Sequence, residues 1–246
     1  MKKKFTRNKV FLYFLVLSIK GNLFIFPSCF VPLINNDTAQ INPESTNQRI
    51  SGAFEVGRGR ISSFFFGGSE KFTSVGVVGS YQIGYGISKN FEAGGQFGGG
   101  IGQIIEEFIK ESKEESNSET ISESKKEKEG SITKEERSII GNLTGLGYLK
   151  IGGSVGNFNF AIKLAPGVGI LYSTQSITPV VPLLTGYVDL MLGFGNPEKL
   201  TLYLGFEYLI IPRLGANLHF EKFSLFAQIS GAEDLFFLKL GAGYKF

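Results

Sequence analysis

Residues that could carry acid–base or nucleophilic chemistry are few in this chain of 246 residues, which holds one histidine and one cysteine. His219 stands two positions before Glu221, so the two side chains would share one face of an extended strand and could act as an acid–base pair. The three aspartates are scattered, and the sequence contains no nucleophile elbow, no zinc-binding helix motif and no phosphate loop. We therefore expect His219 to be structural, and we expect no enzyme, cofactor or metal centre.

Cys29 ends a segment with the pattern of an export signal. Basic residues in the first nine positions precede the apolar run "VFLYFLVLSI", which is too short for a transmembrane helix of about 20 residues. The following "LFIFPSC" is similar to a bacterial lipobox at Ser28, although Phe26 and Pro27 depart from the usual pattern. Two outcomes stay open, namely acylation of Cys29 or cleavage near an unmodified cysteine. We expect residues 1–29 to be the signal and 30–49 to be a polar periplasmic linker.

A charged segment interrupts the rest of the chain. Residues 106–137 are mostly Glu, Lys and Ser, with too few apolar side chains to form a packed core. We expect a solvated loop at about 104–139, disordered or partly helical. The alternative is a charged surface that binds an extracellular partner. The net charge of +3 is too small to indicate nucleic acid as a partner.

The remaining segments alternate with a period of two, which is typical of β-strands. Short connections follow every second strand and longer loops follow most of the others, as in an up-and-down transmembrane β-barrel. We expect one antiparallel barrel over residues 50–246, with about ten strands (8–12). The predicted strands are 50–58, 74–86, 90–102, 140–154, 157–171, 180–194, 198–210, 213–221, 222–230 and 235–246.

Residue types indicate which face of the strands meets lipid. In "KLTLYLGFEYLI" one face carries Leu and Phe, and the other carries Thr, Tyr, Gly and Glu. A soluble sheet would expose the second face to water, yet glycine, present 33 times, is far denser there than on ordinary solvated strands. We therefore expect the apolar face to point outward to lipid. Four tyrosines near strand ends would then lie at the membrane interface, namely Tyr81, Tyr85, Tyr208 and Tyr244.

The last eight residues, "KLGAGYKF", supply a more specific signal. Lys239, Gly241, Tyr244 and Phe246 occupy the positions of the C-terminal motif that outer-membrane β-barrels present to their assembly machinery, and the sequence resembles that class of protein. The stretch from Gly79 to Gly98 also resembles a hairpin of poorly characterised outer-membrane barrel families. This resemblance implies integral insertion in the bacterial outer membrane, with lipid and the barrel-assembly machinery as partners. An even strand count places both ends of the barrel in the periplasm.

Charges on the inward face would fill the lumen. Their signs nearly balance, so we expect internal ion pairs that brace a plugged or very narrow lumen, since a selective pore is more often lined by one sign. The predicted lumen charges are Glu55, Glu92, Lys150, Lys163, Asp189, Glu207, His219, Glu221, Lys239 and Lys245.

The expected function follows from this architecture. The protein would have a structural or adhesin-like role through its extracellular loops, with an unknown extracellular partner at the charged loop. One alternative is a narrow channel for small solutes. Another is a soluble or lipid-tethered periplasmic β domain, and an outer-membrane enzyme built around His219 is the least favoured.

Overall fold

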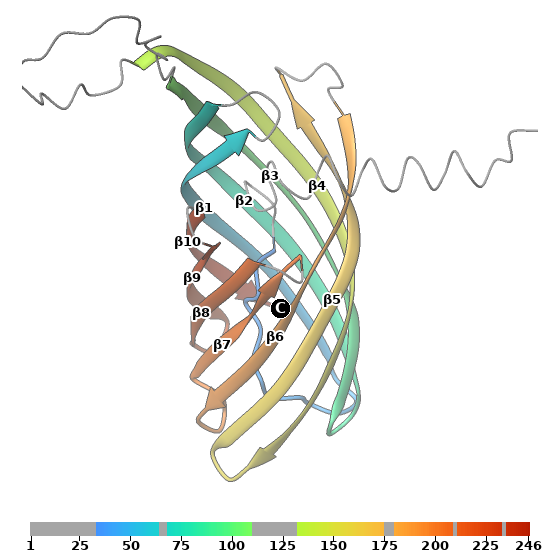
Figure 1. Cartoon of the computed structure of the whole chain (residues 1–246). Coiled ribbons are helices and arrows are strands. Elements are labelled where there is room, and N and C mark those ends of the chain that lie inside the picture. Colours follow the sequence, from blue (N-terminus) through green and yellow to red (C-terminus); the bar gives the residue numbers. More distant parts are fainter. Residues whose placement is uncertain (1–32, 64–67, 110–131, 175–179, 209–210, 233–234) are drawn as a thin grey trace, which may run out of the picture.

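Ten antiparallel strands close into a single barrel in the computed structural model (Figure 1). The structure describes residues 33–63, 68–109, 132–174, 180–208, 211–232 and 235–246. Each strand pairs with its neighbour in sequence, and β1 pairs with β10 to complete the ring. The strands are β1 Thr46–Ser63, β2 Gly68–Ser88, β3 Phe91–Ile109, β4 Ile132–Val155, β5 Phe158–Ser173, β6 Val180–Phe194, β7 Leu200–Glu207, β8 Ile211–His219, β9 Phe223–Ala232 and β10 Leu235–Lys245.

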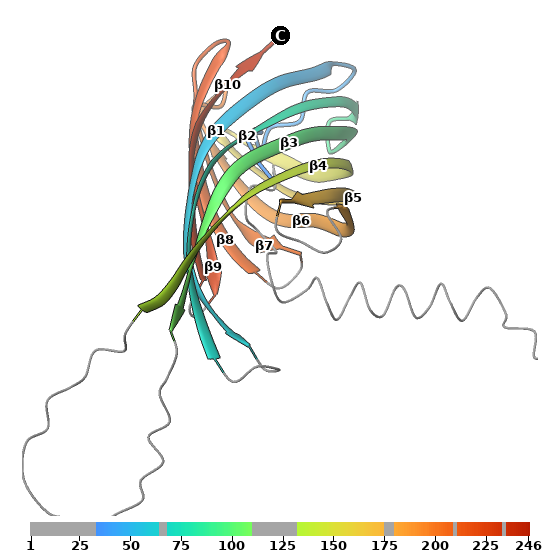
Figure 2. The same cartoon turned by 90° about the horizontal axis from the view of Figure 1, so that it is seen from above.

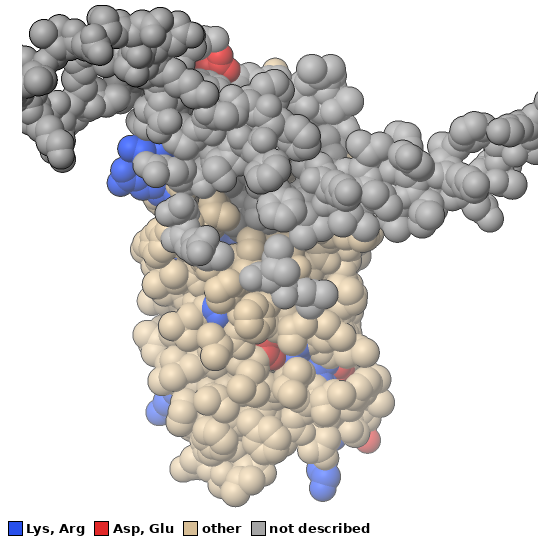
Figure 3. Space-filling view, in the orientation of Figure 1, with Lys and Arg blue, Asp and Glu red and all other residues tan. Residues whose placement is uncertain are grey.

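Alternation along each strand separates an apolar outside from a polar inside. On β5, Ile162 is 55% exposed, whereas the next residue, Lys163, is 0% exposed. On β7, Leu204 is exposed while Tyr203 and Glu207 are buried. Figure 3 shows the consequence: most of the visible wall is free of charged residues. The predicted fold, including the direction of its faces, is therefore confirmed.

Strand length differs around the barrel. The strands β7 and β8 have 8 and 9 residues, close to the minimum for crossing a bilayer, whereas β2, β3 and β4 have 21, 19 and 24. Figure 2 shows the ends of β1, β2, β3 and β4 running past the other strands, and β1 stays paired with β2 as far as Ser63↔Gly68. We call this the loop end of the barrel, and the opposite end, with short connections such as 195–199, the turn end.

The long strands correct the predicted bounds of the charged loop. The sequence placed this loop at about 104–139, but β3 continues to Ile109 and β4 already begins at Ile132. The two strands stay paired through this region, for example at Gln103↔Ile139 and Glu106↔Glu136. Backbone pairing can extend a charged strand because it depends little on side-chain polarity. The central part, residues 110–131, lies outside the described residues.

The predicted linker of residues 30–49 is also corrected, because β1 begins at Thr46 and residues 33–41 lie inside the barrel. Residues 33–41, which we call the plug, run through the lumen towards the turn end (blue trace in Figure 1). Seven of its nine residues, 33–37, 39 and 41, are buried. At the turn end, the backbone of Glu44 and Ser45 pairs with Gly86, and these bonds fix where the chain passes from the plug into β1.

Three of the four expected interface tyrosines lie on the outer face. Tyr81 and Tyr85 are 37% and 50% exposed, and Tyr244 makes edge-to-face contacts with Phe223 and Phe246. Tyr208 differs from the expectation, because it follows the end of β7 and packs against a lumenal cluster. Among the described residues, no helix is long and apolar enough to cross a membrane.

Candidate functional site

The lumen around the plug is the most elaborate polar site among the described residues. Inward side chains of the wall hold the plug by its backbone carbonyls. Arg213 on β8 donates to the carbonyl of Leu33 at 2.9 Å, and Gln96 on β3 donates to that of Ile34 at 3.0 Å. Further donors are Arg49 to Asn36 O at 2.8 Å, and Asn217 to Asn35 O at 2.9 Å and to Asp37 O at 3.1 Å. The wall therefore recognises the extended backbone of the plug from several sides.

Apolar plug residues fill three gaps between the inward side chains. Ile34 packs in a cluster with Phe72, Ile104, Ile140 and Phe237. Burying one such side chain contributes about 1.5–3 kcal/mol, so this contact adds to the polar ones in holding the segment. Two further plug residues complete the other lumenal clusters, Leu33 beside Leu146, Tyr148, Ala165 and Tyr187, and Ala39 beside Ala161, Met191 and Tyr203.

Asp37 is the charged centre of the plug. Its carboxylate is fully buried and lies 3.2 Å from the ammonium groups of both Lys150 and Lys163. Burial acts to raise the pKa of Asp37, but the positive charges of Lys150, Lys163 and Arg49, with a hydrogen bond from Gln82, outweigh it and hold that pKa well below its ordinary value. Asp37 is therefore ionised at neutral pH and neutralises cations of the wall.

Glu198, in the connection between β6 and β7, anchors the plug at the turn end. Its carboxylate accepts hydrogen bonds from the backbone N–H groups of Ala39 at 2.8 Å and Gln40 at 2.9 Å. It also accepts from Asn159 at 2.9 Å and from the hydroxyl of Thr201. Four donors thus satisfy one buried carboxylate, which makes this connection part of the wall around the plug.

Most of the predicted lumen charges lie in the lumen, where they form two networks. In the first, Arg213 pairs with Asp189 and Glu207, and its guanidinium stacks on the Tyr187 ring at 4.0 Å. Lys239 extends this network, with Glu207 at 3.7 Å and Glu55 at 3.4 Å. The second network surrounds Asp37, and in it Lys150 also pairs with Glu92 at 2.7 Å.

Two of the predicted lumen charges, Glu221 and Lys245, are not fully buried in the lumen. Glu221 is wrong as a lumen charge, because it is exposed in the connection after β8, where the strand alternation has ended. His219, the last residue of β8, consequently has no partner in Glu221 and lies with its Nε2 atom 2.8 Å from the Thr201 hydroxyl. Lys245, the last residue of β10, is only partly buried.

Four charged residues of the site are absent from the sequence prediction: Asp37, Arg49, Glu198 and Arg213. The alternation could have found two of them, since Arg49 shares the parity of Glu55 and Arg213 that of His219. Asp37 lies outside any strand pattern, and Glu198, the first residue of the predicted strand 198–210, shares the parity of the outward Leu200 and Leu202, so no local signal places either residue in the lumen.

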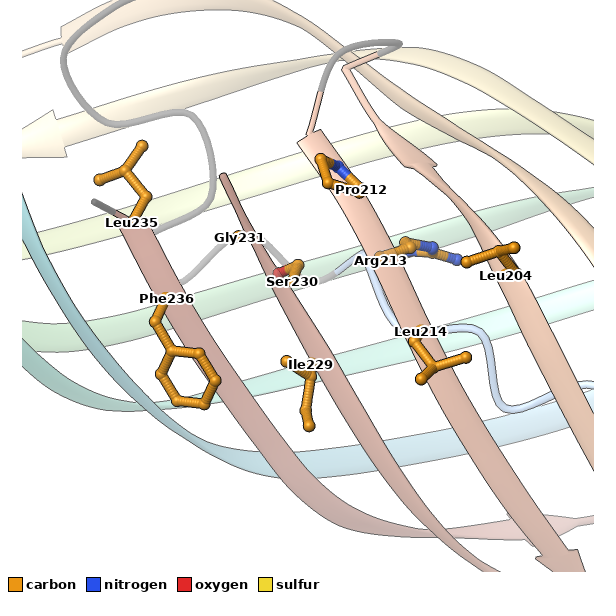
Figure 4. Close-up of a pocket in the computed structure, with 9 residues that line it drawn as sticks. All are labelled: Leu204, Pro212, Arg213, Leu214, Ile229, Ser230, Gly231, Leu235 and Phe236. Carbon is orange, nitrogen blue, oxygen red and sulfur yellow. The ribbon is translucent and has the colours of Figure 1, made fainter. Parts of the chain in front are cut away.

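A side pocket of about 330 Å³ lies in the wall next to Arg213. It lies where the pairing of β8 with β9 stops at Arg213↔Ser230, beside Pro212, which has no N–H to donate. Figure 4 shows apolar side chains of four neighbouring strands around it. Its lining comprises Leu204, Pro212, Arg213, Leu214, Ile229, Ser230, Gly231, Leu235 and Phe236.

The C-terminal motif lies on the strand that closes the barrel. Lys239 points into the lumen, whereas Phe246 is 67% exposed on the outside. The backbone N–H of Phe246 donates to Gln48 O of β1 at 3.2 Å, so the end of the chain takes part in closure. Cys29 and the rest of the expected export signal lie outside the described residues.

Comparisons with known proteins find similarity to solved structures. No family model matches the chain, and no curated protein is similar to it in sequence. The translocator domain of the autotransporter NalP from Neisseria meningitidis is 10% identical, with 98% of this chain and 97% of that chain covered and a TM-score of 0.38. An outer membrane channel from Pseudomonas putida F1 is 10% identical, with 87% and 100% covered and a TM-score of 0.42. Ail, the attachment invasion locus protein of Yersinia pestis, is 9% identical, with 82% and 97% covered and a TM-score of 0.31.

Proposed function

We propose that the protein is an integral β-barrel of the bacterial outer membrane, closed by its own plug, with a structural or surface-interaction role through its loop end. The observation that carries this proposal is the polarity of the wall. Exposed leucines, isoleucines and phenylalanines surround a lumen that holds the charged side chains. In water such a surface would favour aggregation, whereas in a bilayer it matches the lipid, and each strand is hydrogen-bonded to two neighbours around the closed ring.

The filled lumen favours the hypothesis of a closed barrel rather than that of a channel. Leu33, Ile34 and Asp37 are at most 1% exposed, and the inward side chains around them contact the plug directly. A water-filled path would leave these groups accessible. The interaction role draws on the loop end, where β3 and β4 stay paired at acidic positions such as Glu106 and Glu136 on the way to the charged loop.

Membrane fractionation and gel mobility test the first part of the proposal. We expect the protein in the membrane fraction, with a band that migrates differently in SDS before and after boiling, because a closed barrel has no free edge at which to unfold. A protein that stays soluble without detergent and shows no shift would be the periplasmic β domain instead.

A binding assay tests the interaction role. We expect the purified protein to bind a polylysine-coated surface at low salt and to lose that binding at high salt. A variant lacking residues 110–131 should keep the gel shift and lose most of the binding. Equal binding by the two proteins would contradict a role for the charged loop.

A narrow channel is the second candidate. It is favoured by the fact that the plug is covalently continuous with β1 but contacts the rest of the lumen only non-covalently. Only hydrogen bonds, ion pairs and apolar contacts hold residues 33–41 in place. Planar-bilayer recording separates the two candidates: steady conductance by the unmodified protein indicates a channel, and its absence indicates a closed barrel.

A further inference from the structure

The surroundings of Asp37 have the features of a binding site for a carboxylate. One oxygen, Oδ2, accepts a hydrogen bond from the side-chain amide of Gln82 at 3.1 Å and lies 3.2 Å from the ammonium groups of Lys150 and Lys163. The other, Oδ1, accepts from Asn47 at 3.1 Å and from the backbone N–H of Thr38 at 2.8 Å, and it lies 3.8 Å from Arg49. Two separate sets of donors fit the two oxygens of a carboxylate better than they fit a spherical ion.

The wall carries uncompensated positive charge at this place. Within the described part of the chain, Asp37 is the one carboxylate paired with Lys163 and with Arg49. The cations of the other network differ, since Arg213 and Lys239 both have acidic partners on neighbouring strands. The strands of the barrel therefore neutralise one network by themselves and leave the other to an occupant of the lumen.

Three of the donors, Gln82, Lys150 and Lys163, also have partners on the wall, whereas Arg49 donates to Asn36 O of the plug as well. Glu92 fixes Lys150 at 2.7 Å and accepts a hydrogen bond from Tyr148, also at 2.7 Å. Lys163 donates to Gln82 Oε1 at 2.8 Å, and its ammonium lies 4.4 Å from the centre of the Tyr148 ring. Except for the N–H of Thr38, all the donors belong to β1, β2, β4 and β5, so they would remain on the wall if the plug left the lumen.

We propose that Asn47, Arg49, Gln82, Lys150 and Lys163 form a binding site for a small carboxylate solute, and that Asp37 occupies this site as a tethered ligand. A free carboxylate competes with Asp37 for the same donors. When it wins, the plug loses its central ion pairs, and the solute replaces the charge that the wall lacks. The inference goes beyond the structural role proposed above, since it assigns a ligand class to the lumen.

Tethering explains why the site is closed at low solute concentration. A group on a short linker has an effective concentration in the millimolar range, so a free carboxylate must exceed that concentration or bind more tightly. Removing the carboxylate of Asp37 removes this competitor and leaves the donors in the wall. The Asp37→Ala variant is therefore the form in which a free ligand is easiest to detect.

Chemical rescue tests the proposal. The full chain with Asp37→Ala and the unmodified chain are heated in detergent with sodium formate, sodium acetate or sodium chloride at equal ionic strength, and the loss of the unheated gel band is followed. We expect formate and acetate to raise the midpoint temperature of thermal unfolding of Asp37→Ala by several degrees relative to chloride, with a saturable dependence on the concentration of the carboxylate. The unmodified chain should show no such difference.

A matched variant and a folding readout complete the test. Adding Lys163→Met to Asp37→Ala should abolish the rescue, because it removes one ammonium of the site. If Asp37→Ala does not assemble in chloride, formate present during refolding should restore the gel shift. The proposal is overturned if formate acts no better than chloride in both readouts, or if rescue is equal with and without Lys163.

Discussion

Replacing Arg213 by methionine should expose how strongly the lumen depends on its ion pairs. The guanidinium is 1% exposed, it pairs with Asp189 and Glu207, and it donates to the carbonyl of Leu33. Arg213→Met leaves Asp189 as a buried carboxylate without its cation. Breaking a buried pair in this way costs about 3–5 kcal/mol, so we expect a loss of that size in the free energy of unfolding.

A double-mutant cycle measures the pair itself. In Arg213→Met/Asp189→Asn no uncompensated charge remains at the pair, so the double variant should be more stable than the sum of the single effects predicts by about 1–3 kcal/mol. Urea unfolding in detergent, followed by the mobility of unheated samples, gives the free energies. Single effects below about 1 kcal/mol, or strict additivity, would show that water screens this part of the lumen and would refute the reasoning.

Three further predictions concern the plug, a glycine of the lumen and the end of the chain. The pKa of Asp37 is depressed in the folded state, so its contribution to the free energy of unfolding is complete above the unfolded pKa of about 4 and is lost as the pH falls through the folded value. The stability difference between the protein and Asp37→Asn should therefore be constant from pH 8 to 5 and shrink only below about pH 4. A steep decline of this difference between pH 7 and 6 would contradict the prediction. Gly84→Ala should lower the unfolding midpoint, because its Cβ would overlap the Tyr148 hydroxyl that bonds Glu92, whereas Gly147→Ala, which has open space, should be close to neutral in the same gel assay. Deleting Phe246 should reduce the amount of heat-shifting barrel in cells but not the stability of the barrel that does form, as pulse labelling followed by gel shift would show, and unchanged assembly would argue against the C-terminal motif.

Strand periodicity predicted the barrel well because the bilayer imposes it on every strand. In β5 the alternation of Phe158, Phe160 and Ile162 with Asn159 and Lys163 requires only that one face meets lipid and the other does not. The same parity gave the inward position of the acids and lysines of the wall. The extension of β3 to Ile109 was missed because apolar alternation stops where the strands leave the barrel wall, although their backbones remain paired.

The plug could not be predicted in the same way. From Asn35 onward its sequence is mostly polar with no period, which is typical of a linker. What makes it an interior segment is tertiary: Arg213, Gln96 and Asn217 come from distant parts of the chain to satisfy its carbonyls. A polar segment is expected to be exposed to water only where the protein interior offers it no hydrogen-bond partners. In a lumen lined with hydrogen-bond donors, a polar segment can be buried.

Cross-linking of the plug to the wall tests the central claim most directly. Asn36 Nδ2 lies 3.1 Å from the Ser51 hydroxyl on the inner face of β1, while the neighbouring Ile50 is 51% exposed on the outer face. In a Cys29→Ser background, the pair Asn36→Cys/Ser51→Cys should be joined efficiently by a short thiol cross-linker in native membranes, and Asn36→Cys/Ile50→Cys should not. Cross-linking at position 50, or none at position 51, would contradict a barrel with its apolar face outward and its N-terminal segment in the lumen.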